Sequence, residues 1–208
     1  GENILAYDTY SQIQQIDKKQ AVERVIKDIL SVSDIKLILE MPVVSKKTGI
    51  RDRFYIALLY DSGCRDQEIL DLKLSDVKVN GDISNLSVVG KGTKFRVTPL
   101  SKEVTSMFKQ YVSIFHHDNV QGDSLFYTVR KGIKGKMSPD NVARFLNGYE
   151  KLAKVVNPAL PHLHPHLFRH ARAMHLYQAG MPLPLVSEWL GHSQLETSLI
   201  YAYADTEM

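Results

Sequence analysis

The chain has 208 residues, 44% of them apolar and 24% charged, which is the composition of an ordinary water-soluble folded protein. No apolar run approaches the roughly 20 residues that span a bilayer, and residues 1–10 lack the basic and apolar regions of a secretory signal. The single cysteine, Cys64, excludes an intrachain disulfide and is typical of a reducing cytosol, so we expect a cytoplasmic location. The net charge of +3 leaves a polyanionic partner open if basic side chains cluster.

The first part of the chain predicts a polar lead followed by helices. Residues 1–30 are polar and weakly periodic, and we expect a linker or the tail of a preceding domain. A capping box at Ser31–Asp34 predicts a helix that stops before Pro42. Gly63 is expected to break the chain between a second and a third helix. The expected helices here are Ile35–Glu40, Arg53–Asp61 and Cys64–Leu74.

The hydrophobic period changes at about Val77. Two β-rich runs flank Gly90 and Gly92, which predicts an antiparallel hairpin within Asn85–Leu100. Apolar residues then recur at helical spacing over Val104–Phe115. The remaining expected elements are a loop at Val129–Pro139 and helices after Ser138, from about His166 to Gly180, over Leu183–Leu190 and over about Gln194–Tyr203. The predicted fold is mainly α with a small antiparallel β-sheet, in the α+β class.

Four histidines fall within nine residues: His162, His164, His166 and His170. A metal site is one interpretation, but two prolines argue against a regular strand and no cysteine lies nearby. Capping, packing or exposure to water is the ordinary alternative, which we favour for His162 and His164. The third interpretation is a phosphate site. A helix that starts near Pro165 puts His166 and Arg169 on one face at its N-terminus, where backbone N–H groups also attract an anion.

Other cations could complete such a phosphate site. Arg65, with Glu68 three residues on, is either part of a surface ion pair or a second guanidinium whose planar fork matches two phosphate oxygens. Lys91 stands between two glycines in a segment without a Walker A pattern. It is either an exposed turn lysine or a group that reaches a phosphate or protonates a leaving oxygen. Lys94 and Arg96 on the same hairpin would add phosphate contacts without base specificity.

Two tyrosines near the end of the sequence are candidate nucleophiles. Tyr201 and Tyr203 follow His192, which comes directly after Gly191 in an expected turn between helices. Aromatic packing is the ordinary role of either tyrosine, because a phenol titrates at about pH 10 and is then a poor nucleophile. A phenol becomes reactive where a base removes its proton or positive charge stabilises the phenolate. Two arginines and a histidine would supply both.

Four segments, in this order, resemble the motifs of the tyrosine recombinases, also called phage-type integrases. GCRDQEILDLKLSDV resembles the first arginine box, VVGKGTKFRVTPL the hairpin with the catalytic lysine, HLFRHARAMHLYQAG the H-x-x-R box, and LGHSQLETSLIY the box with the nucleophile. The resemblance runs from about Ser31 to the end. It implies the catalytic-domain fold of that family and an integrase or transposase of a mobile element. Such an enzyme cleaves and rejoins double-stranded DNA without metal, ATP or another cofactor.

Carried over by position, the resemblance also implies roles for individual residues. Tyr201 would attack the scissile phosphate and form a 3′-phosphotyrosyl link. Arg65 and Arg169 would clamp the non-bridging oxygens, whose negative charge grows in the transition state. Lys91 would protonate the departing 5′ oxygen. The supporting roles would fall to His166 for proton transfer at the tyrosine, to His192 for a hydrogen bond to the phosphate, to Glu68 for holding the site and to His170 for packing behind it.

Two features depart from the family pattern. Tyr203 stands where the family often has histidine, which leaves a second candidate hydroxyl, although the spacing from Gly191 favours Tyr201. Only seven residues follow Tyr201, where relatives usually continue into a terminal segment that docks on a neighbouring protomer. Residues 1–30 are also too few for the core-binding domain that precedes the catalytic domain in relatives. We therefore interpret 31–208 as the catalytic domain of a longer protein.

The partners and the alternatives follow from the same resemblance. It implies a homotetramer on paired DNA sites for the full-length protein and no membrane, while the fragment alone could be a monomer. A type IB topoisomerase shares the chemistry, but the chain is short and lacks obvious topoisomerase extensions. A non-catalytic DNA-binding module that keeps the fold is the alternative from another class, and the presence of every reactive residue type argues against it.

Overall fold

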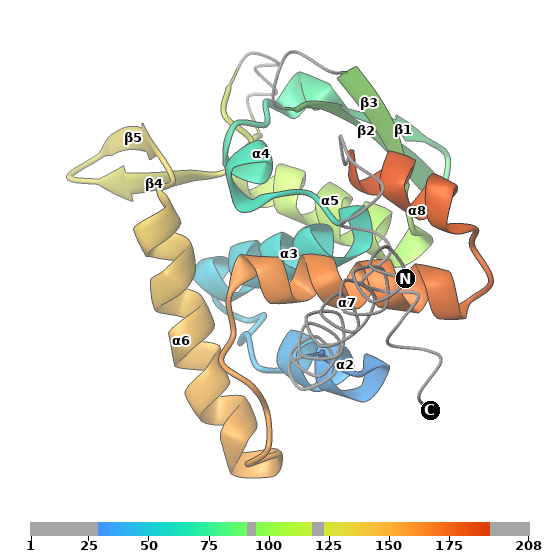
Figure 1. Ribbon diagram of the computed structural model, residues 1–208. Helices are drawn as coiled ribbons and strands as arrows, with labels where there is room; N and C mark the ends of the chain where they lie inside the picture. The colour runs from blue at the N-terminus through green and yellow to red at the C-terminus, as the bar shows by residue number, and fades with distance from the viewer. Residues whose placement is uncertain (1–28, 91–94, 118–122, 192–208) are drawn as a thin grey trace, which may run out of the picture.

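The computed structural model describes residues 29–90, 95–117 and 123–191 (Figure 1). Its helices are α2 (Val32–Glu40), α3 (Lys47–Ser62), α4 (Asp66–Leu70), the 3-10 helix η1 (Leu74–Asp76), α5 (Lys102–Phe115), α6 (Pro139–Val156), α7 (Pro165–Gln178) and α8 (Leu183–Leu190). Its strands are β1 (Val77–Asn80), β2 (Ile83–Val89), β3 (Phe95–Leu100), β4 (Tyr127–Arg130) and β5 (Ile133–Lys136). The order β1-β2-β3 forms one antiparallel sheet, and β4-β5 forms a separate hairpin. This mainly helical architecture confirms the predicted fold class.

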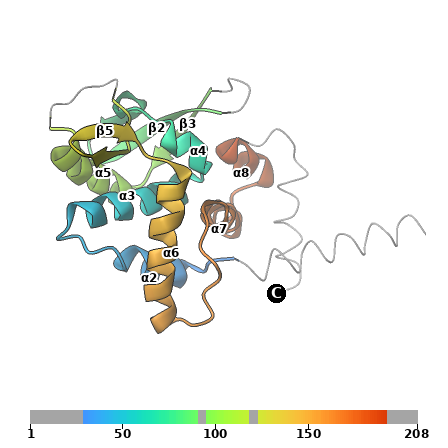
Figure 2. The same ribbon diagram turned by 90° about the vertical axis from the view of Figure 1, so that its left-hand side faces the viewer.

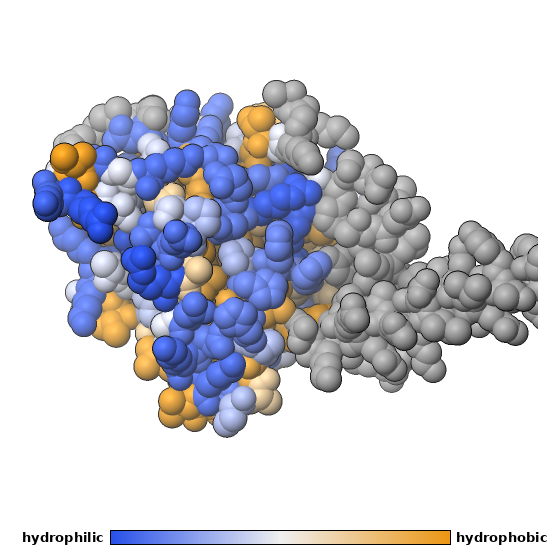
Figure 3. Space-filling model, turned by 60° about the vertical axis from the view of Figure 1, so that its left-hand side comes forward, coloured by the Kyte–Doolittle hydropathy of each residue, from blue (hydrophilic) through white to orange (hydrophobic). Residues whose placement is uncertain are grey.

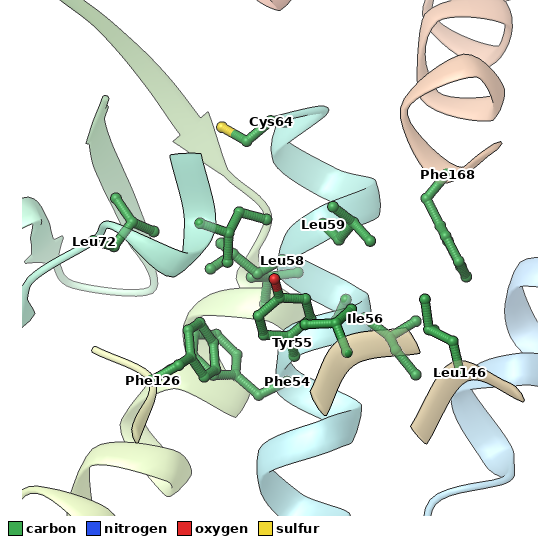
Figure 4. Packing of buried hydrophobic residues seen from close by; sticks show 14 of the residues in the cluster. Phe54, Tyr55, Ile56, Leu58, Leu59, Cys64, Leu72, Phe126, Leu146 and Phe168 are labelled. Carbon is green, nitrogen blue, oxygen red and sulfur yellow. The ribbon is translucent and has the colours of Figure 1, made fainter. Parts of the chain in front are cut away.

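Helix α3 is the centre of the domain. It contacts α2, α5, α7 and β3, and its residues from Phe54 to Leu59 are all buried. A helix that is apolar on every side has to be enclosed by other elements. Figure 4 shows Phe54 and Tyr55 next to Phe126, with Leu146 of α6 and Phe168 of α7 close to the same helix.

Two buried carboxylates tie α3 to its neighbours. Asp52 accepts a hydrogen bond from the Tyr149 hydroxyl of α6 at 2.9 Å. Asp61 accepts the Ser101 backbone N–H at the start of α5 at 2.8 Å, and it pairs with Arg172 of α7 at 3.3 Å. Asp52 therefore anchors α6 to the central helix, and Asp61 anchors α5 and α7.

The register of β2 and β3 decides which side chains of the sheet reach the body of the domain. Along β3, Thr98 and Leu100 are buried while Val97 and Pro99 are exposed. Because successive side chains of a strand point to opposite faces, Arg96 belongs to the same inward set as Thr98 and Leu100. Its partner across the ladder is the buried Val88. The sheet therefore directs Arg96 into the domain.

Several expected boundaries differ from the structure. The second helix begins at Lys47 instead of Arg53, and the third covers only Asp66–Leu70, because Lys73 forms an isolated bridge to Ser124 before η1 begins. The loop expected at Val129–Pro139 is wrong, since most of it forms the β4-β5 hairpin. Its turn residues Lys131 and Gly132 have φ values of 52° and 79°, which suits a two-residue turn of type I′. The helix expected at about Gln194–Tyr203 lies outside the described residues.

The outer helices and the hairpin give the domain its surface. Figure 2 shows α6 running along the outside of the domain next to α2, which it contacts. The face in Figure 3 is mainly hydrophilic and carries separate hydrophobic patches, in keeping with exposed apolar residues such as Ile133 and Val155. In the described part of the chain, no helix is both long and apolar enough to cross a membrane.

Candidate active site

The first arginine of the candidate site lies directly after the central helix. α3 ends at Gly63 with φ 62°, and the chain then reaches Arg65, the residue that caps the N-terminus of α4. Glu68 fixes Arg65 in two ways: its carboxylate accepts the Arg65 backbone N–H at 2.8 Å and the Arg65 Nη1 at 3.0 Å. The Arg65 side chain is still 38% exposed, so its guanidinium can reach a ligand.

A second guanidinium holds the same carboxylate from the sheet. Arg96 donates from Nη1 to Glu68 Oε1 at 3.1 Å and from Nη2 to Oε2 at 2.6 Å, a fork that occupies both oxygens. Nη2 also lies 3.3 Å from Cys64 Sγ. Burial alone would raise the pKa of Glu68, but the Arg96 and Arg65 contacts outweigh it and lower that pKa. Glu68 is therefore an anion between two cations. The sequence paired it with Arg65 but not with Arg96.

The second predicted arginine comes from α7 and is almost fully buried. Arg169 is 5% exposed and donates from Nη1 to the Gly63 carbonyl at 2.6 Å and from Nη2 to the Leu190 carbonyl at 2.8 Å. Burial, and then the charge of Arg65, lowers the pKa of Arg169 to about 10, which leaves it protonated at neutral pH. The charges of Arg65 and Arg96 both act on Arg169, and Arg169 is bound to the Gly63 carbonyl, so the three guanidinium groups lie near one another.

The histidines of the site segment lie at different depths. His166 is exposed near the N-terminus of α7, and it is close enough to Asp66 of α4 for its charge to act on that carboxyl. His170 was predicted to pack behind the site, and this is wrong because the residue is exposed. Its pKa is nevertheless lowered by desolvation and by nearby His166 and Arg169.

The two remaining histidines of the segment have roles near its start. His162 bonds Glu150 through Nδ1 at 2.8 Å, and His164 is the residue that caps the N-terminus of α7. Both are loop residues, as expected. Within residues 29–90, 95–117 and 123–191, no three histidine, cysteine, aspartate or glutamate side chains form a group that could hold a metal ion.

The structure brings together Arg65, Glu68, Arg96 and Arg169, and it places His166 near Asp66 of the same helix as Glu68. The predicted Lys91, Lys94, His192 and Tyr201, with the alternative Tyr203, lie outside the described residues. Their neighbours in the chain can still be placed. Lys91 and Lys94 fall between the end of β2 at Val89 and the start of β3 at Phe95. Helix α8 is closed by Gly191, directly before His192. The described cluster thus lies where three of the four motifs meet.

Sequence reasoning missed two residues that hold α7 and α8 to the end of α3, close to Gly63. The guanidinium of Arg172 lies 5.5 Å from the ring centroid of Trp189, and its ion pair with Asp61 joins α7 to α3. Trp189 donates from Nε1 to the Ser62 carbonyl at 3.0 Å. Arg172 follows Arg169 by three residues, so helical spacing could have placed it on the same side of α7. Nothing comparable points to Trp189.

Comparison with solved structures defines the class of fold. A XerH site-specific recombinase bound to its difH substrate, in a pre-cleavage complex, is 27% identical with a TM-score of 0.70. The match covers 86% of this chain and 51% of that one. The Tn1549 transposon integrase, in complex with circular intermediate DNA, shares the fold at 20% identity and a TM-score of 0.61, over 87% of this chain and 66% of that one.

The chain belongs to the phage integrase family, whose model matches residues 23–208. Tyrosine recombinase XerD of Rickettsia prowazekii (strain Madrid E) is 35% identical over 189 residues, which is 86% of this chain and 59% of that protein. XerD of Proteus mirabilis is 32% identical over 89% of this chain and 57% of that protein. The chain thus spans less than two thirds of the length of these relatives. The resemblance noted in the four sequence motifs is confirmed at the level of the family.

Proposed function

We propose that the chain is the catalytic domain of a tyrosine-type site-specific DNA recombinase that integrates or excises a mobile element in the cytoplasm. The observation that carries this proposal is the convergence of Arg65 and Arg169 from separate helices, with Glu68 as their neutralising support. Two guanidinium groups, with the exposed imidazole of His166 about one helical turn before Arg169, make a site for one phosphate group. The relatives named as recombinases support the same conclusion.

The proposed reaction needs no net oxidation and no energy source. The phenol oxygen of Tyr201 forms a bond to phosphorus while the bond from phosphorus to the 5′ oxygen breaks. The phenol proton passes to His166, and Lys91 gives a proton to the departing 5′ oxygen. The phosphotyrosyl link conserves the energy of the phosphodiester, so a 5′ hydroxyl can reverse the step on another strand.

The two arginines would act on the phosphate in different ways. Arg65 presents a partly exposed guanidinium, whereas Arg169 uses two of its N–H groups to hold backbone carbonyls and stays charged because its pKa is about 10. His192 would add a hydrogen bond to the same phosphate. We extend the proposal to a homotetramer on paired DNA sites for the whole protein, with Lys94 as a further contact to the DNA backbone.

The test is covalent trapping on DNA that cannot be rejoined. A library of nicked duplexes with randomised central positions is incubated with the chain in EDTA, and adducts that resist SDS are recovered and sequenced. We expect an adduct on a restricted set of sequences. Tyr201→Phe should abolish the adduct and Tyr203→Phe should retain it, which mass spectrometry of the linked peptide checks directly.

Each other outcome has a definite meaning. An adduct that persists in Tyr201→Phe and disappears in Tyr203→Phe would move the nucleophile. Fluorescence anisotropy with the same duplexes measures binding separately from cleavage. Binding without any adduct would leave the non-catalytic DNA-binding module, and the absence of binding even at low salt would remove DNA as the partner. Relaxation of a supercoiled plasmid by the chain alone would favour the topoisomerase alternative.

A further inference from the structure

Arg96 has contacts that do not suit the phosphate contact predicted for it. Its side chain is 12% exposed, and both of its terminal nitrogens are committed to the carboxylate of Glu68. Its charge is thereby paired with a carboxylate, whereas the terminal nitrogens of Arg169 are bound to neutral backbone carbonyls. The remaining nitrogen of Arg96, Nε, is buried and has no hydrogen-bond partner in the described structure.

Arg96 also limits the space at the end of α8. Gly191 closes that helix with φ 67°, and a Cβ atom built on it would lie 3.0 Å from Arg96 Nη1 and 3.3 Å from Cδ and Cζ. Such contacts are tighter than ordinary van der Waals contact, so the Gly191 backbone packs directly on the guanidinium. The residue before it, Leu190, gives its carbonyl to Arg169. Two arginines, one from the sheet and one from α7, thus fix the last residues of α8.

The contact between Arg96 and Gly191 joins segments that carry groups of the proposed reaction. Arg96 lies in β3, directly after the connection that holds Lys91, and its carboxylate partner Glu68 holds Arg65. Gly191 is directly followed by the segment with His192 and Tyr201. Arg96 is thus part of the strand that follows Lys91, it binds the carboxylate that holds Arg65, and it lies against the glycine that precedes the nucleophile segment.

We propose that Arg96 is a positioning residue that holds Glu68 and the end of α8 in register, so that the groups of the proposed reaction meet at one phosphate. The inference rests on the proposed function and deepens it. Arg96 itself touches no substrate atom. Its effect passes through Arg65, which Glu68 orients, and through the chain that leaves Gly191.

The test separates positioning from a contact with DNA. Arg96→Met removes the fork, Arg96→Lys keeps the charge without it, and Lys78→Met is a control that removes an exposed cation from the same sheet. In single-turnover cleavage at saturating DNA, we expect Arg96→Met to be slowed about 100-fold, the order that a displacement of about 1 Å produces. Its dissociation constant should change less than about threefold, and Arg96→Lys should recover part of the rate. Lys78→Met should cleave at the wild-type rate.

A phosphate contact predicts the opposite pattern. In that case Arg96→Met would bind DNA more weakly. The slope of log K against log salt concentration would become shallower by about 0.9, the value for one phosphate contact. Cleavage at saturating DNA would stay at the wild-type rate. That result would overturn the inference. A single-turnover rate constant reports on folded enzyme alone. A variant that is only less stable would therefore cleave at the wild-type rate constant, and a wild-type rate constant in Arg96→Met would overturn the positioning role.

A second measurement does not depend on DNA at all. Trp189 is the chain's single tryptophan and lies on α8, two residues before Gly191. With 5-fluorotryptophan incorporated there, we expect Arg96→Met to shift the ¹⁹F resonance and Lys78→Met to leave it in place. An unshifted resonance in Arg96→Met would overturn the positioning of α8 even if the enzyme cleaves DNA. If the wild-type chain forms no adduct but the resonance shifts, the proposed function fails while the contact stands.

Discussion

Glu68 is the residue on which the arginines of the site depend. Its side chain is 7% exposed and its two oxygens receive donors from Arg65 and Arg96 at distances between 2.6 and 3.1 Å. These partners stabilise the charged form of the buried carboxylate, and its pKa is lowered as a result. Arg96 depends on Glu68 in turn, because a largely buried guanidinium without a counter-charge is costly.

Replacing Glu68 by glutamine should therefore cost much more than a surface charge. Glu68→Gln keeps the shape of the side chain but leaves Arg96 buried without its anion, and we expect it to lower the free energy of unfolding by about 3 kcal/mol. Cleavage should also slow, since Arg65 loses its fixed direction. Urea denaturation and single-turnover trapping measure the two effects.

The same helix offers a matched control. Asp71 caps the other end of α4 and pairs with Lys136, but both side chains are about half exposed. Asp71→Asn should cost less than about 1 kcal/mol, because water already solvates the pair. Equal losses for Glu68→Gln and Asp71→Asn would show that burial adds nothing to the Glu68 pairs.

Individual site residues were predictable only where the signal is local. Arg65 and Glu68 are three residues apart, and so are His166 and Arg169, which is enough for helical spacing to pair them. The fork from Arg96 to Glu68 joins a strand to a helix across the fold, and only the packing of the sheet on α4 creates it. The same packing directs Arg96 into the domain, although the sequence alone had placed it on the surface as a contact to DNA phosphates.

The connection between α6 and α7 places the histidine end of the site. Three donors converge on Glu150 of α6: Lys154 Nζ at 2.6 Å, the Leu163 N–H at 2.8 Å and His162 Nδ1 at 2.8 Å. Partial burial alone would raise the pKa of Glu150, but these hydrogen bonds outweigh it and lower the pKa to about 2. One carboxylate therefore fastens the loop that leads into Pro165 and His166.

This attachment predicts a dependence of stability on pH. A carboxyl whose pKa is lowered on folding contributes stability above its ordinary pKa of 4.5 and loses it as the pH falls toward 2. Glu150→Gln should therefore melt below wild type at pH 6, and the gap should narrow between pH 4.5 and pH 2. Thermal melts at several pH values check this, with Glu40→Gln, an exposed carboxylate of α2, as the control. A gap that stays constant at low pH would contradict the role given to the charge of Glu150.

Elements were predicted best where a cap and a period agree. The capping box at Ser31 and the serine–proline start of α6 both mark real helix starts. The β4-β5 hairpin was missed because its turn is Lys131-Gly132, and lysine is an unusual residue at a positive φ. The third helix was overextended because Leu72 and Leu74 continue the apolar pattern. Both are buried, but Leu72 lies after the end of α4 and Leu74 begins η1.

At the scale of the whole molecule, distant elements meet at Gly63. This residue ends α3, and its carbonyl accepts Arg169 of α7 at 2.6 Å. A Cβ atom at Gly63 would lie 2.7 Å from Leu190 Cδ2 of α8, and Leu190 is fully buried, so it cannot swing aside into water. The sequence predicted a helix break at this glycine. It could not predict that α7 and α8 depend on the break, because those contacts span more than half of the chain.

A comparison of two glycines isolates the contact from the backbone conformation. Gly63 and Gly81 both have φ 62°, but nothing lies within 4 Å of a Cβ atom built on Gly81. Gly81→Ala should therefore cost only the left-handed backbone penalty of about 1 kcal/mol. Gly63→Ala should cost about 3 kcal/mol, because overpacking against Leu190 adds to the same penalty. Denaturant unfolding measures the loss of stability in both variants. Equal losses would mean that α8 moves away from the substituted residue at no cost in free energy. If α8 does move, trapping should also slow in Gly63→Ala alone, since Leu190 and Gly191 lead into the segment of the proposed nucleophile.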